Sequence, residues 1–61
     1  MQRNAGNPMD IKVTTSDGRT NEYTGIVSVS SDSHGSLHLF DQSGPRALYS
    51  AESGWALEVL L

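Results

Sequence analysis

The stretch Gly54-Trp55-Ala56-Leu57-Glu58-Val59-Leu60-Leu61 decides how the rest of the chain is interpreted. Every second residue in it is large and apolar, which is the period of a β-strand with one face buried. A short helix over residues 53–61 is the alternative, but Gly54 and the sustained alternation favour a strand. The residues predicted to point inward from this strand are Trp55, Leu57, Val59 and Leu61.

Alternation also marks a strand near the start of the chain, over residues 9–14. The segment Ser16-Asp17-Gly18 that follows is typical of a turn. A three-residue loop, with Gly18 left-handed in a G1 bulge, pairs Ile11 with Tyr23. A two-residue loop would place these two large side chains on opposite faces. We therefore predict the three-residue loop and an antiparallel hairpin.

The next segment, residues 20–30, is long for one strand. If Gly25 marks a bend or bulge, the side chains of all odd-numbered residues lie on the same face, and Tyr23, Val27 and Val29 point inward. Ile26 then points outward. We expect either one strand sharply curved at Gly25 or two strands in series.

Two further strands are predicted over residues 36–41 and 46–50, separated by turn-rich links. Leu37 and Leu39 share the inner face of the first, while His38 and Phe40 share its outer face. In the second, Tyr49 points inward and Leu48 outward. We therefore predict an all-β antiparallel meander of about five strands, either a curved sheet or an SH3-like partly open barrel. It would form one domain over residues 9–61, after a flexible leader of residues 1–8.

Composition limits the classes of function. The chain has 61 residues, no cysteine, four basic and seven acidic residues, and a net charge of −3. A core this small leaves packing and self-association as sources of stability, because disulfides are excluded. The basic residues are scattered, which disfavours nucleic-acid binding. No signal-like segment or membrane-length apolar stretch is present, so we expect a cytoplasmic protein without membrane contact.

Residues with catalytic or metal-binding chemistry do not form a convincing site. Asp32, His34, His38 and Asp41 are the only cluster of metal-ligand types, but His38 is predicted on a strand and His34 in the preceding turn. The serine-rich segment 30–36 lacks the G-x-S-x-G elbow of a serine hydrolase and is typical of turns. We predict no enzymatic activity, no cofactor and no metal.

The outer faces of the predicted strands are more informative, because several large side chains point out from neighbouring strands. A contiguous patch of this kind usually marks an interface. A second copy is one expected partner, since an isologous dimer would add to a small core. The residues predicted to form the protein interface are Ile26, His38, Phe40, Leu48 and Leu60.

Several short motifs are spread along the chain. They are Asp17-Gly18, Tyr23, Gly35-Ser36-Leu37-His38-Leu39 with Asp41, Gly44, Ala47 with Tyr49, and Gly54-Trp55. Together they resemble a group of short uncharacterised β proteins of actinobacteria and their phages. The resemblance covers about residues 10–59 and implies a compact accessory protein without an assigned activity. We expect a non-enzymatic binding protein, of the accessory or inhibitor type found in phages and mobile elements. The alternatives are a self-assembling or decorating structural subunit and a small nucleic-acid-binding barrel.

Overall fold

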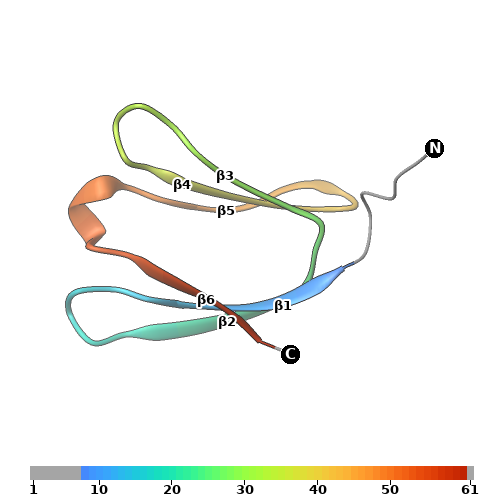
Figure 1. Ribbon diagram of the computed structural model, residues 1–61, viewed down its shortest axis with the longest axis horizontal. Helices are drawn as coiled ribbons and strands as arrows, with labels where there is room; N and C mark the ends of the chain where they lie inside the picture. The colour runs from blue at the N-terminus through green and yellow to red at the C-terminus, as the bar shows by residue number, and fades with distance from the viewer. Residues whose placement is uncertain (1–7, 61) are drawn as a thin grey trace.

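The fold is all-β, as predicted, and consists of two three-stranded antiparallel sheets. It is known from a computed structural model that describes residues 8–60, so most of the predicted leader lies outside the described residues. One sheet has the strand order β2-β1-β6 and the other β3-β4-β5 (Figure 1). The arrangement is consistent with a small, partly open barrel. The elements are β1 (Met9–Thr14), β2 (Thr20–Ile26), β3 (Ser28–Ser31), β4 (Leu37–Asp41), β5 (Gly44–Tyr49), the 3-10 helix η1 (Ala51–Ser53) and β6 (Ala56–Leu60).

The hairpin between β1 and β2 has the predicted register. Ile11 is paired with Tyr23. The loop is closed by the hydrogen bonds from the Thr15 amide to the Arg19 carbonyl and from the Gly18 amide to the Thr15 carbonyl, both 2.9 Å. Gly18 has a φ of 87°, the left-handed conformation that a type I turn with a G1 bulge requires.

The prediction that Ile26 points outward is wrong. Met9 pairs with Ile26 and Ile11 with Tyr23, so β2 has one more residue than β1 between these pairs. This extra residue is a β-bulge next to Gly25, whose φ is 72°. Because a bulge shifts the alternation by one residue, Ile26 faces the same side as Tyr23. Its side chain is completely buried in the core.

The long segment around Gly25 is two strands in series, which belong to different sheets. After Ile26 the chain leaves the first sheet, and the Val27 amide donates a hydrogen bond of 2.8 Å to the Phe40 carbonyl of β4. Val29 then packs against the core opposite Leu39. The bulge therefore lies just before the corner where the chain passes from one sheet to the other. Figure 1 shows this passage from β2 to β3.

The core lies between the two sheets and includes side chains from both. Trp55 packs against its edge and donates a hydrogen bond of 2.8 Å from Nε1 to the Gly35 carbonyl, which satisfies the indole N–H. The fully buried residues are Ile11, Val13, Ile26, Leu37 and Leu39, and the partly buried ones packed on them are Met9, Tyr23, Val29, Ala47, Tyr49, Trp55 and Leu57.

The C-terminal segment is a strand and not the alternative helix. β6 is paired with β1, with Leu57 opposite Val13 and Val59 opposite Ile11. Val59 thus lies on the core face, as predicted, but it is 48% exposed at the edge of its sheet. Leu60 is opposite Asp10 and lies on the outer face of this sheet.

Candidate functional site: the outer face of β4 and β5

The outer face of the sheet β3-β4-β5 carries a patch of large side chains. The pairing places Ser30, His38 and Leu48 side by side in one row. Phe40 and Pro45 form the next row. We call His38, Phe40, Pro45 and Leu48 the β4–β5 patch. Leu48 is the most exposed large hydrophobic residue of the described chain, at 65%.

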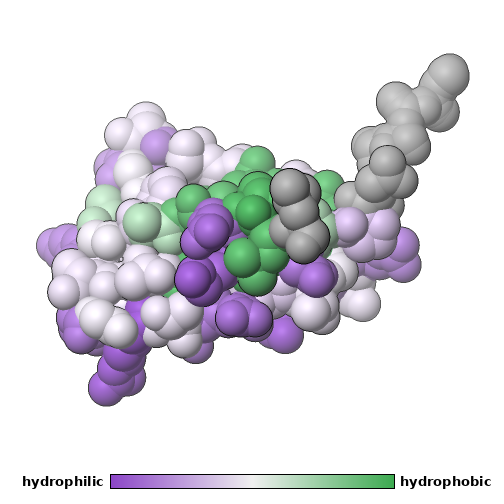
Figure 2. All heavy atoms as spheres, turned by 60° about the horizontal axis from the view of Figure 1, so that its bottom comes forward, coloured by the Kyte–Doolittle hydropathy of each residue, from purple (hydrophilic) through white to green (hydrophobic). Residues whose placement is uncertain are grey.

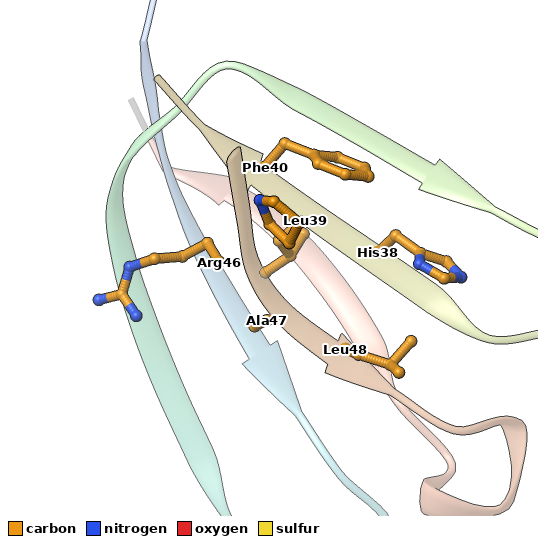
Figure 3. A pocket seen from close by; sticks show the side chains of 7 residues that line it. His38, Leu39, Phe40, Arg46, Ala47 and Leu48 are labelled. Atoms are coloured by element: carbon orange, nitrogen blue, oxygen red, sulfur yellow. The ribbon is translucent and has the colours of Figure 1, made fainter. Parts of the chain in front are cut away.

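A hollow of about 350 Å³ lies on the β4–β5 patch. Figure 3 shows the side chains of His38, Phe40 and Leu48 around it, while Arg46 extends away from them. A hollow bounded by aromatic and aliphatic side chains has the chemistry to accept an apolar side chain of a partner. Its lining residues are His38, Leu39, Phe40, Pro45, Arg46, Ala47 and Leu48.

His38 is held in place from two directions. Its Nε2 lies 3.1 Å from Oδ2 of Asp32, and its ring is stacked on that of Phe40 with the centroids 6.4 Å apart. The other carboxylate oxygen of Asp32 accepts hydrogen bonds from the amides of His34 at 2.9 Å and Ser36 at 3.0 Å. The hydrogen bond from His38, followed by that from Ser36, lowers the pKa of Asp32. The β3–β4 turn thus orients a side chain of the patch.

Arg46 extends from β5 to a side chain of the other sheet. β5 has a bulge at this point, because Leu39 is opposite Ala47 while Phe40 is opposite Pro45. The guanidinium carbon of Arg46 lies 5.2 Å from the ring centroid of Tyr23, a distance at which a cation–π attraction operates. Arg46 therefore borders the patch without pointing into it.

Two tyrosines join the edges of the two sheets beside Arg46. The hydroxyls of Tyr23 in β2 and Tyr49 in β5 are 2.6 Å apart, and the rings meet edge to face. The side-chain amide of Asn21 also donates a hydrogen bond from Nδ2 to the Tyr49 hydroxyl, at 3.1 Å. Burial, followed by the hydrogen bond with Tyr49, raises the pKa of Tyr23 to about 12.

This raised pKa predicts a loss of stability in alkali. An unfolded tyrosine ionises near pH 10, whereas folded Tyr23 keeps its proton to about pH 12. The stabilisation is therefore fully present below pH 10 and is lost as the pH rises through 12. We expect the urea midpoint of the wild type to fall as the pH rises from 10 to about 11, and that of Tyr23→Phe to fall less. Equal slopes in the two proteins would contradict this account.

The structure brings together three of the five residues predicted for the interface. His38, Phe40 and Leu48 share the β4–β5 patch. Ile26 is in the core, and Leu60 lies on the outer face of the other sheet. Pro45 also belongs to the patch, although it was not predicted from the sequence. Its place opposite Phe40 depends on the bulge at Arg46, for which the sequence has no clear signal.

The charged residues do not form a second site. Each basic side chain within residues 8–60 lies near a carboxylate: Lys12 is 3.5 Å from Glu58, Arg19 is 3.4 Å from Asp17, and Arg46 is 3.7 Å from Asp41. In the same part of the chain, no group of three or more metal-ligand side chains converges. No helix there is long and apolar enough to cross a membrane.

No protein-family model, curated protein or solved structure matches this chain.

Proposed function

We propose that this is a non-enzymatic binding protein that contacts a protein partner through the β4–β5 patch. The observation that carries the proposal is that Leu48, near the end of β5, is 65% exposed beside a mostly apolar hollow. An accessory or inhibitory role for a phage or mobile element is the form of this proposal that the sequence motifs favour.

The energetics of the patch suit binding. Complete burial of a side chain such as Leu48 or Phe40 contributes about 1.5–3 kcal/mol. The hydrogen bond of His38 to Asp32 and its stacking on Phe40 already restrict its rotation, which lowers the entropy cost of ordering it in a complex. The exposed serines Ser28 and Ser30 lie on the same face and supply a polar rim.

The size of the protein sets how much of its surface a partner would cover. A standard interface buries about 800 Å² on each side, whereas the total accessible surface of this protein is 4125 Å². A partner would therefore cover much of one sheet face, with the β4–β5 patch as its centre.

The test is capture of partners from a lysate of the encoding organism by immobilised wild type and by Leu48→Lys. We expect Leu48→Lys to lose at least about 90% of one captured protein, because one buried, unpaired charge costs several kcal/mol. Its urea midpoint should equal that of the wild type, since Leu48 lies outside the core.

The matched control is Thr24→Lys, because Thr24 is exposed on β2 of the other sheet. This variant carries the same added charge away from the β4–β5 patch and should retain the captured protein. Equal capture by the wild type and both variants would contradict the proposal.

Self-assembly into a structural subunit is a second candidate function, and one observation favours it. Within residues 8–60, the edge strand β6 is paired on one side only, with β1. Unpaired, regular edges are the usual site of strand addition.

A further inference from the structure

The sheet edges of this protein differ in how well they are protected against strand addition. β5 contains Pro45 and a bulge at Arg46, and β3 has only four residues. β2 has the bulge next to Gly25 and is joined to β5 through its tyrosine. Prolines, bulges and short length are the features that block edge pairing.

β6 has none of these features. Its five residues pair with β1 without any register shift, and they include no proline or glycine. Its one charged residue, Glu58, lies 3.5 Å from Lys12, so the negative charge at this edge is partly neutralised. Among the described strands, β6 is the one whose free edge is regular.

Part of the core face is exposed to solvent beside the free edge of β6. Val59 lies on the core face, opposite the completely buried Ile11, but is itself 48% exposed. Figure 2 shows hydrophobic residues gathered in the middle of the molecular face to which β6 belongs. A strand added beside β6 would cover Val59 and extend the core face.

We propose that β6 binds β6 of a second copy, antiparallel and about a two-fold axis at Val59. The two β2-β1-β6 sheets then form one continuous sheet. This pairing would be the interface for self-assembly, the second candidate function. It does not involve the β4–β5 patch.

The choice of a second copy and of this axis follows from the charge of Glu58 and the exposure of Val59. In an antiparallel pair, residues directly opposite each other share a face. An axis at Glu58 would place two carboxylates opposite each other, which is destabilising. Axes at Leu57 and at Val59 both keep the carboxylates apart, but only the axis at Val59 places the two exposed valines opposite each other. It also places Glu58 opposite Leu60 of the second copy. The strand is thus complementary to itself in this register.

The first experiment measures mass by sedimentation equilibrium from micromolar to millimolar concentration. We expect a dimer for the wild type and for Leu48→Lys. We expect a monomer for Val59→Lys, because two lysines would be directly opposite at the axis. Val59→Thr keeps the β-branched shape and serves if Val59→Lys does not fold; it should weaken the dimer measurably.

The second experiment tests the register by cross-linking. The protein has no cysteine, so each single-cysteine variant reports one position. Val59→Cys should form a disulfide-linked dimer at micromolar concentration, because directly opposite residues have Cβ atoms about 4.5–5.5 Å apart. Leu48→Cys, which replaces a more exposed side chain, should not.

Three results would overturn the proposal: a wild-type monomer up to millimolar concentration, loss of the dimer in Leu48→Lys but not in Val59→Lys, or faster cross-linking through Leu48→Cys. The second and third would mean that the copies meet through the β4–β5 patch. Loss of the captured partner in Leu48→Lys would support the proposed function whether or not β6 forms a dimer.

Discussion

Ile26→Ala is expected to leave most of the protein unfolded at room temperature. Ile26 is completely buried between the sheets, and truncation of a buried isoleucine costs about 2–5 kcal/mol. A domain of this size has a free energy of unfolding of only about 3–5 kcal/mol. The loss caused by Ile26→Ala is therefore comparable with the total stability of the wild type. Urea titration followed by the fluorescence of the single tryptophan, Trp55, measures the change.

Two other variants make this result specific. Ile26→Val removes one methylene group and should cost about 0.5–1.5 kcal/mol. Leu48→Ala removes three carbon atoms, more than Ile26→Val, but from the surface. It should change the free energy of unfolding by less than about 0.5 kcal/mol. An Ile26→Ala protein with a wild-type midpoint would show that β2 has no bulge at Gly25 and that Ile26 lies outside the core.

Gly54→Ala is expected to cause the second-largest loss, about 2–4 kcal/mol from left-handed strain and overpacking together. Gly54 follows η1 with a φ of 65°, and a Cβ atom there would lie 2.7 Å from the Cβ of Ser16. Close to this point the Ser16 amide donates a hydrogen bond of 2.9 Å to the Ser53 carbonyl. The substitution would therefore push the β1–β2 turn away from the segment that leads into β6. The urea midpoint measures this loss.

The steric and conformational parts of this loss can be separated. Gly18 also has a positive φ, but nothing lies within 4 Å of the position of an added Cβ. Gly18→Ala should therefore lower the free energy of unfolding by only about 1–2 kcal/mol. Adding Ser16→Gly to Gly54→Ala should recover the steric part. A Gly54→Ala loss no larger than that of Gly18→Ala would contradict the close contact between Gly54 and Ser16.

Much of the fold could be predicted because the sequence is locally consistent. Alternation identified the strands, and the demand that Ile11 and Tyr23 share a face selected the correct hairpin loop. The same alternation placed His38 and Phe40 together on an outer face. In each of these cases, the period of two residues was uninterrupted within the segment.

The errors come from features that interrupt that period. The bulge at Gly25 moved Ile26 from the surface to the core, although the glycine itself was recognised as a possible bulge. The bulge at Arg46 placed Pro45 opposite Phe40. A one-residue bulge changes the face of the residues that follow it in the same strand, and its position depends on how the two sheets pack, which the local pattern does not contain.

Edge position is the other property that local pattern does not reveal. Val59 and Leu57 are equivalent in the alternation, and both lie on the core face. Val59 is nevertheless 48% exposed, whereas Leu57 is partly buried against the core, so the two positions of this edge strand are covered to different extents. Which strand forms an edge is decided by the pairing order of all strands, and this order is a property of the whole fold.

The measurement that tests the central claim most directly is a residue-resolved map of the partner's binding face. The captured protein would be titrated into the isotopically labelled chain, and the amide chemical shifts followed. The largest changes are predicted at His38, Phe40 and Leu48. Changes concentrated on the outer face of β1 and β6, at Lys12 and Glu58, with the β4–β5 patch unaffected, would contradict the account.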